Sequence, residues 1–340
     1  MKKFSLFLIS LFIGIGLFVW TLKIVGWQEI KNSILVFTGW QGMVILFLSF
    51  LAALAGTWKW REVLEETGAK VNFREVWRVY LASFSIRFLA PIIIVGAEIF
   101  QGYILKKKNS IPWSQGMASV IIDRILEWTV NLTVIFFGGM FFLFLIGFPP
   151  LKLVIIFGGL FSLFLFGLSF FYFKAFKKES MAKAFAKVFN YKTGVQPLEV
   201  EREIFNFFKA SKKKIICKVF CLNFLRAGIM LLRAWLLVSF LGGKIGALSA
   251  VSLLGFTYLA VMIPIPTALG SHELVQTFAF NSLNLGVANA TAFTMIIRGA
   301  ELIVALVGVA ILFRFGIFLI KNIFMEKING LPKNNDAWSQ

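Results

Sequence analysis

Apolar runs of about 20 residues recur along this chain, and they constrain its fold more than any other feature. A run of this length crosses the hydrocarbon core of a bilayer, about 30 Å thick, as an α-helix. Because lipid offers no hydrogen-bond partner to the backbone, helices or closed barrels are required at membrane depth. The chain is 59% hydrophobic, above the roughly half that is typical of soluble domains. The sequence therefore predicts an all-α, polytopic integral membrane protein.

A short pattern occurs twice within the apolar runs. Each copy contains one proline, two glutamates and one arginine: Pro91, Glu98, Arg124 and Glu127 in the first copy, and Pro266, Glu273, Arg298 and Glu301 in the second. In both copies six residues separate the proline from the first glutamate, and two separate the arginine from the last glutamate. Between the first glutamate and the arginine lie 25 residues in one copy and 24 in the other. We interpret the two copies as one structural unit used twice.

The prolines of this pattern predict two re-entrant helical hairpins. The apolar segment 79–105 has dense positive charge on both sides, and positive charge marks the cytoplasmic face, so both of its ends should lie there. Proline cannot continue the helical hydrogen-bond ladder, which places a break near Pro91. Segment 246–284 has no Lys or Arg and contains Pro264 and Pro266, and we expect a second hairpin there that enters from outside. Hairpins from opposite faces form inverted repeats, an architecture of many secondary transporters.

The rest of the chain is predicted to form complete crossings within a single transmembrane domain over residues 1–340. Helices are expected over residues 4–23, 41–59, 113–147, 151–173, 215–241 and 287–320. A charged stretch from Lys59 to Arg78 is expected to follow the second helix. Residues 174–214 are expected to form a cytoplasmic basic loop, with either an interfacial amphipathic helix over 182–189 or a solvated, frayed one.

The distribution of charge predicts the orientation. Of 35 Lys and Arg residues, four fall in the expected external loops, six lie within apolar helices, and the remaining 25 are cytoplasmic. This asymmetry predicts a multi-pass protein of the cell membrane with cytoplasmic N- and C-termini. The formal net charge of +19 is explained by the same rule and by contact with anionic lipid. No nucleic-acid-binding motif is present, so no nucleic-acid partner is expected.

Charged side chains inside the apolar runs are the candidate substrate-binding residues. Each costs roughly 2.5–3.5 kcal/mol at mid-bilayer on insertion scales, so each is expected to face the interior and find a partner. The candidates are Glu98, Arg124, Glu127, Glu273, Arg298, Glu301, Arg226 and Arg233. The two i,i+3 Arg–Glu pairs could each neutralise themselves, but their recurrence favours a shared site. The planar guanidinium groups of Arg124 and Arg298 would suit a phosphate.

Three further features of the apolar runs leave alternatives open. Arg226 and Arg233 lie seven residues apart on one helical face, where they could form steps for a headgroup, snorkel toward the membrane surface or pair with acids. Glu98 and Glu273 could bond half-helix ends or the facing arginines. His272, the only histidine, is more typical of a structural residue than of a proton relay, and whether it takes part stays open.

Several classes of chemistry find no support in the residues. There is no Ser/His/Asp order, no phosphate-binding loop and no dinucleotide fingerprint. Cys217 and Cys221 are four residues apart without further His or Cys nearby, which is a weak metal signal. We therefore expect no enzymatic activity, no metal and no cofactor.

Both copies of the pattern resemble a known family. The first signature runs from Pro91 through Gly96 to Glu98, followed by Asp123, Arg124 and Glu127; the second runs from Pro264 and Pro266 through Leu269, Gly270 and Glu273 to Arg298. These segments are similar to the membrane region of lysylphosphatidylglycerol synthases, the flippase-like integral membrane proteins. The similarity spans nearly the whole chain. Where that family commonly has a Gly-Arg dipeptide after the first proline, this chain has Ile92 and Ile93, and Arg87 lies one turn before Pro91.

The resemblance implies a standalone lipid-translocating or lipid-binding module without the synthase domain, so aminoacyl transfer is not expected. The expected substrate is an anionic phospholipid or a polyprenyl-phosphate lipid that moves between leaflets. A secondary transporter of a small anion, a lipid-modifying membrane enzyme and a scaffold that binds a partner through 174–214 are the alternatives. Small residues along the apolar runs would support contacts either within one chain or between copies in a homo-oligomer.

Overall fold

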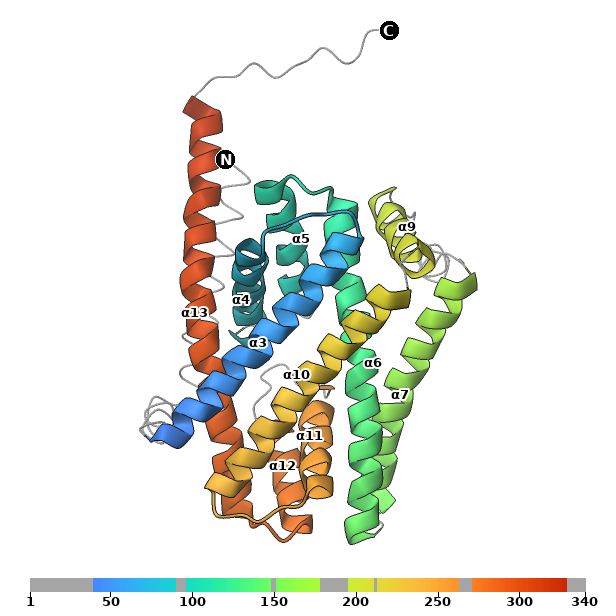
Figure 1. Ribbon diagram of the computed structural model, residues 1–340, viewed down its shortest axis with the longest axis vertical. Helices are drawn as coiled ribbons and strands as arrows, with labels where there is room; N and C mark the ends of the chain where they lie inside the picture. The colour runs from blue at the N-terminus through green and yellow to red at the C-terminus, as the bar shows by residue number, and fades with distance from the viewer. Residues whose placement is uncertain are drawn as a thin grey trace.

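The computed structural model describes residues 39–89, 96–147, 151–177, 195–210, 213–262 and 271–328. The helices expected over 4–23 and 182–189, and the three prolines of the expected hairpins, lie outside these ranges. The described residues form α-helices without any strand (Figure 1). They are α3 (Trp40–Glu66), α4 (Phe73–Leu89), α5 (Gly96–Asn109), α6 (Trp113–Ile146), α7 (Leu151–Lys177), α9 (Val195–Ala210), α10 (Lys213–Phe240), α11 (Ala247–Met262), α12 (Ser271–Ser282) and α13 (Val287–Ile328).

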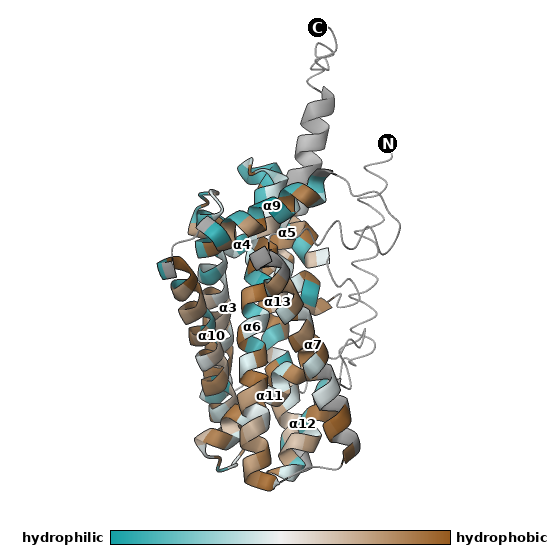
Figure 2. Cartoon of the chain, turned by 90° about the vertical axis from the view of Figure 1, so that its right-hand side faces the viewer, coloured by the Kyte–Doolittle hydropathy of each residue, from teal (hydrophilic) through white to brown (hydrophobic). Residues whose placement is uncertain are grey.

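Most predicted crossings are present as helices. Four of the described helices contain stretches long and apolar enough to cross a membrane: Trp40–Glu66, Trp113–Ile146, Lys214–Phe240 and Asn289–Ile317. Apolar residues dominate the helices along most of the bundle, and hydrophilic residues gather at the end where α9 and the outer parts of α4 and α5 lie (Figure 2). The prediction of an all-α membrane protein is confirmed.

Each of the two segments that were expected to be broken is described as two separate helices. Segment 79–105 falls on α4, which ends at Leu89, and on α5, which begins at Gly96. Segment 246–284 falls on α11, which ends at Met262, and on α12, which begins at Ser271. In each case the two short helices pack on one another, and Lys108 Nζ at the end of α5 lies 2.5 Å from Glu75 Oε2 at the start of α4. Their re-entry into a membrane stays a prediction.

The two halves of the chain pack reciprocally. Helices α3 to α6 correspond in order to α10 to α13: α4 of the first half packs on α13 of the second, and α11 of the second half packs on α6 of the first. Helices α3 and α10 pack against each other and run in opposite directions (Figure 1). The α4–α5 pair lies in the upper half of Figure 1 and the α11–α12 pair in the lower half. This exchange is the arrangement expected of an inverted repeat.

Glycines allow the helix backbones to approach closely at the two reciprocal contacts between the halves, which are α4 with α13 and α6 with α11. A Cβ atom on Gly138 of α6 would lie 2.9 Å from the Cα of Gly255 on α11. A Cβ atom on Gly308 of α13 would lie 2.1 Å from the carbonyl oxygen of Leu81 on α4. At the same crossing the Ser85 hydroxyl donates a 2.6 Å hydrogen bond to the Ala305 carbonyl of α13. Small residues that let helix backbones approach are typical of packing inside membranes.

Several helix boundaries differ from the sequence prediction; α13, for example, continues to Ile328. The second crossing does not end near residue 59, since α3 continues to Glu66. Part of the expected loop 174–214 is also helical, since it contains α9. This helix packs on α6 through Val200, Ile204 and Phe207. In α9 three glutamates outnumber Arg202 and Lys209, so this part of the loop is not basic. An apolar face that a neighbouring helix buries explains why α9 is ordered against the bundle.

Candidate functional site

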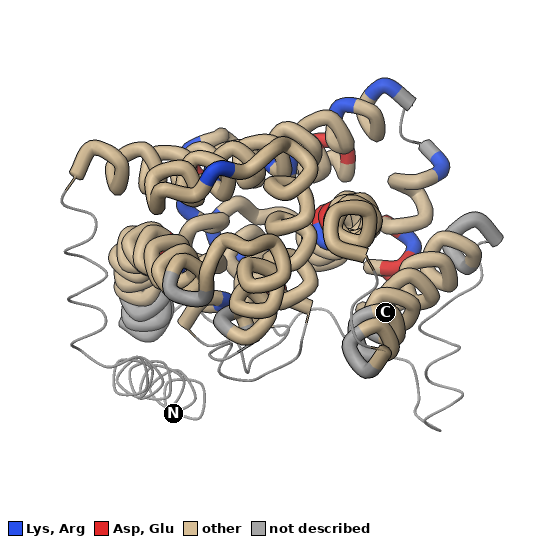
Figure 3. The backbone as a smooth tube through the Cα atoms, turned by 90° about the horizontal axis from the view of Figure 1, so that it is seen from below, with Lys and Arg blue, Asp and Glu red and all other residues tan. Residues whose placement is uncertain are grey.

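Glu127 lies near the middle of α6 and contacts cations from three helices. Its Oε2 atom lies 2.8 Å from Arg124 Nη1 on α6 and 3.2 Å from Lys59 Nζ on α3. Its Oε1 atom forms an ion pair with Arg226 Nη1 on α10. Only 11% of the Glu127 side chain is exposed. In Figure 3 the acidic and basic segments of different helices lie next to one another within the bundle.

Lys59 is a buried member of this site, although the sequence prediction placed it where the second helix ends and the charged stretch begins. Its side chain is 1% exposed, and its ammonium group lies 3.1 Å from Asp123 Oδ1. Two carboxylates on α6 compensate the charge, which is why α3 can continue through this position inside the protein. The signal that sequence reasoning missed is helical spacing. Lys59 continues a buried stripe formed by Ser49, Ala52 and Gly56 at intervals of three and four residues.

Glu98 joins the same site from the first turn of α5. Its Oε1 atom lies 3.3 Å from Arg124 Nε and 3.6 Å from Arg87 Nη1. Arg87 also lies over the ring of Tyr80, 5.9 Å from its centre. Of the two alternatives for Glu98, contact with facing arginines is therefore realised, and it involves both Arg87 and Arg124. Arg87, the residue that precedes the first proline by one turn, contributes a guanidinium to this place.

We call Lys59, Arg87, Glu98, Asp123, Arg124, Glu127 and Arg226 the first charge cluster. Counted in their ordinary ionised forms, these described residues supply four cations and three carboxylates. Several guanidinium nitrogens are buried without a hydrogen-bond partner: Arg87 Nη1, Arg124 Nη2 and Arg226 Nε. Buried donors normally find acceptors, so this excess of donors and positive charge favours an anionic group.

The second copy of the pattern forms a smaller group in the described structure. Arg233 Nη2 on α10 lies 3.1 Å from Glu301 Oε1 on α13, and Arg233 Nη1 donates a 3.0 Å hydrogen bond to the Ser49 hydroxyl of α3. Arg298 is half-buried on α13, one turn before Glu301. Glu273 belongs to the first turn of α12, and its side chain lies outside the described residues. Sequence reasoning paired Glu301 with Arg298; the structure adds Arg233.

Helix α10 contacts both copies of the pattern through its two arginines. Arg226 pairs with Glu127, the last glutamate of the first copy, and Arg233 pairs with Glu301, the last glutamate of the second. Of the alternatives for these arginines, pairing with acids is therefore realised. The structure joins Glu98, Arg124, Glu127 and Arg226 in one cluster and links Arg233 to Glu301. A role of these residues in substrate binding stays a prediction.

Other chemistry is sparse in the part of the chain that the structure describes. No group of three or more His, Cys, Asp and Glu residues there is arranged to hold a metal ion. His272 is half-buried in the first turn of α12. Cys217 and Cys221 are exposed, free thiols on α10. At the outer end of α4, burial would raise the pKa of Glu75, but Lys108 and Arg78 outweigh it and hold that pKa below its ordinary value.

Comparison with known proteins gives two matches. A family model described as the lysylphosphatidylglycerol synthase TM region matches residues 7–308. A UPF0104 membrane protein of Methanocaldococcus jannaschii is 24% identical over 284 residues, which are 78% of this chain and 82% of that protein. No solved structure matches the chain.

Proposed function

The chain belongs to the family of the lysylphosphatidylglycerol synthase TM region, and from this premise we propose that it moves an anionic lipid between the two leaflets of a membrane. The substrate would be a phospholipid or a polyprenyl-phosphate lipid. The observation that carries the proposal is the first charge cluster, whose described residues hold four cations against three carboxylates in a buried position. A headgroup phosphate would supply the missing negative charge.

In the proposed mechanism the headgroup crosses the bilayer along polar residues while the acyl tails stay in lipid. Arg124 and Arg226 are placed to receive the phosphate, because each has a guanidinium nitrogen without a hydrogen-bond partner. Guanidinium groups bind phosphate oxygens with short, charge-assisted hydrogen bonds. The phosphate would compete with Glu127 for both arginines, so binding would loosen the contact between α6 and α10. Glu273 and Arg298 of the second copy would line the remainder of the path.

This role requires no covalent chemistry from the protein. A headgroup that passes between leaflets keeps its bonds, so the carboxylates and arginines would act only by binding. We therefore propose a transporter without enzymatic activity, and in the cell membrane we expect both termini on the cytoplasmic side.

Reconstitution into vesicles with a labelled anionic phospholipid tests the proposal. Wild type should exchange the label between leaflets, whereas Arg124→Ala and Arg226→Ala should slow exchange by roughly 10- to 100-fold, as expected for a lost charge-assisted hydrogen bond. Arg298→Ala tests the second copy in the same assay. Arg314→Ala is the matched control, because Arg314 is an exposed residue of α13. Equal exchange in wild type, these variants and empty vesicles would refute the proposal.

A further inference from the structure

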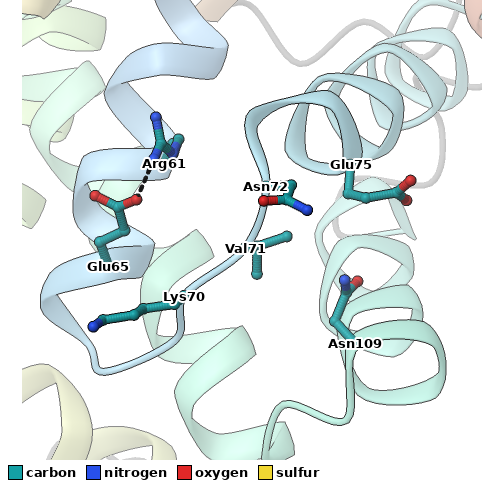
Figure 4. Close-up of a pocket in the computed structure, with 7 residues that line it drawn as sticks. All are labelled: Arg61, Glu65, Lys70, Val71, Asn72, Glu75 and Asn109. Carbon is teal, nitrogen blue, oxygen red and sulfur yellow. Dashed lines mark ion pairs between the residues drawn. The ribbon is translucent and has the colours of Figure 1, made fainter.

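A polar pocket lies away from the first charge cluster, where the connection between α3 and α4 meets the end of α5 (Figure 4). Its volume is about 430 Å³, within the range of small-molecule sites. The lining residues are Arg61, Glu65, Lys70, Val71, Asn72, Glu75 and Asn109. None of them belongs to the first charge cluster. The pocket therefore needs an explanation of its own.

The carboxylates of this pocket are already occupied by cations. Glu65 Oε1 lies 2.6 Å from Arg61 Nη2, and the two side chains are about one-third exposed. Glu75 lies 2.7 Å from Arg78 Nη1 through one oxygen and 2.5 Å from Lys108 Nζ through the other. With Lys70, these side chains comprise four cations and two carboxylates. The lining itself has two cations, Arg61 and Lys70, and two carboxylates. The excess of positive charge comes from Arg78 and Lys108, which lie beside the lining and pair with Glu75.

Two buried polar atoms in the lining have no hydrogen-bond partner. Arg61 Nε is buried without a hydrogen-bond partner, so its pairing with Glu65 leaves a donor unused. The Asn109 side-chain oxygen is also buried without a partner. Asn72 directly precedes α4 and Asn109 is the last residue of α5, so both amide groups lie at the same end of the α4–α5 pair (Figure 4). Unused buried donors and acceptors in a polar hollow are the groups that a ligand would satisfy.

We propose that this pocket is a second binding site and that it takes a phosphate ester. Arg61 and Lys70 supply the charge that attracts the phosphate, and the two asparagine amides bond its oxygens or a neighbouring hydroxyl. The ester is either the headgroup of a membrane lipid, held at the end of the bundle, or a free phosphate compound from solution. Both share the recognised group. The site stands independently of the lipid movement proposed above.

Titration calorimetry on the purified full-length protein in phosphate-free detergent tests the site. Glycerol 3-phosphate and inorganic phosphate are the probes, and glycerol is the uncharged control ligand. Wild type should bind the phosphate compounds, and Arg61→Gln and Lys70→Gln should each weaken binding about tenfold, as expected for one charge-assisted hydrogen bond. Lys106→Gln, which changes an exposed lysine of α5 outside the lining, should bind like wild type.

A second measurement distinguishes the two sources of the ester. The melting temperature of the protein is compared in nanodiscs made of phosphatidylcholine alone and in nanodiscs that also contain an anionic phospholipid. Binding of soluble phosphate that depends on Arg61 and Lys70, without stabilisation by anionic lipid, identifies a free compound. Stabilisation by anionic lipid that is lost in the same two variants identifies a lipid headgroup. If neither arm differs between wild type and these variants, the site does not exist.

The first charge cluster provides a check on independence. Arg124→Ala, which should impair lipid exchange, should retain pocket binding, because Arg124 does not line the pocket. Loss of exchange without loss of pocket binding would separate the two sites. Loss of pocket binding in an Arg124→Ala protein that elutes as folded protein in size-exclusion chromatography would show that the two are one site and would overturn this inference.

Discussion

At the scale of single residues, the interior of this protein is governed by the need to pair ions. Glu127 has three cationic neighbours on α3, α6 and α10, and Lys59 has two carboxylate neighbours on α6. Removing one partner of a buried pair leaves the other charge uncompensated, which costs far more than the pair itself contributes. Loss of any one member of the first charge cluster is therefore expected to leave a buried charge uncompensated and to destabilise the protein.

Lys59→Met should destabilise the protein by about 3–5 kcal/mol, because Asp123 would lose the ammonium group that lies 3.1 Å away inside the protein. Unfolding in detergent with increasing concentrations of sodium dodecyl sulfate measures the change in free energy. Lys218→Met is the matched control. Lys218 pairs with Glu62 at 2.7 Å but is 49% exposed, so its loss should cost no more than about 1 kcal/mol. Equal costs for the two lysines would contradict the burial argument.

Part of this cluster could be predicted from the sequence. Charges inside apolar runs must face the interior, which identified Arg124, Glu127, Arg226 and Glu98. Lys59 escaped because it is followed by further charges, so the sequence pattern at that point is the same as for a helix end at the membrane surface. Only the packing of α3 against α6 distinguishes the two cases, and that packing depends on partners far away in the sequence.

At the scale of helices, the two reciprocal crossings depend on small residues. At Gly308 the backbone of α13 meets Leu81 and Ser85 of α4, and at Gly138 the backbone of α6 meets Gly255 of α11. Backbone atoms cannot move aside as a flexible side chain can. A methyl group at either crossing would therefore push two helices apart.

Gly308→Ala should destabilise the protein by about 1–3 kcal/mol through overpacking, since its Cβ atom would lie 2.1 Å from the Leu81 carbonyl oxygen. Gly139→Ala is the matched control in another long helix, because a Cβ atom at Gly139 meets nothing within 4 Å. Alanine has the higher helix propensity, so the control should be neutral or stabilising. Heating in detergent, followed by size-exclusion chromatography, measures both. A stable Gly308→Ala protein would show that this crossing is looser than described.

The existence of the long helices could be predicted from the length of the apolar runs, but the ends of the helices and the packing of α9 could not. Proline positions predicted one interruption in each of the two segments, since a proline removes a backbone donor wherever it occurs, and the structure describes two separate helices in each segment. The end of α3 at Glu66 and the order of α9 depend on contacts with α6, α7 and α4, which no local pattern encodes. Burial of Val200, Ile204 and Phe207 against α6 and its neighbours stabilises a helix whose composition is otherwise that of a polar loop.

At the scale of the whole molecule, the reciprocal packing of the two halves has an orientational consequence. The outer ends of α4 and α5 lie at one end of the bundle, and those of α11 and α12 lie at the other (Figure 1). If the first pair opens toward the cytoplasm, the second must open toward the opposite side. This follows from the fold together with the charge asymmetry of the sequence.

Single cysteines test that orientation. In a background with Cys217 and Cys221 changed to Ser, Lys107→Cys at the end of α5 should react with a membrane-impermeant thiol reagent only from the cytoplasmic side. Lys244→Cys, in the connection between α10 and α11, should react only from the other side. Both lysines are exposed, so reactivity reports location and not burial. Modification of both from the same side would exclude hairpins that enter from opposite faces.

Helix α10 carries one arginine for each half, and Arg226 and Arg233 are seven residues, or roughly 10 Å, apart along it. Because a single stiff rod holds both contacts, sliding or tilting it perturbs the two glutamates together. A movement of α10 that separated Arg226 from Glu127 would therefore also displace Arg233 relative to Glu301. We therefore expect the ion pairs that α10 makes with the two halves of the bundle to form and break together.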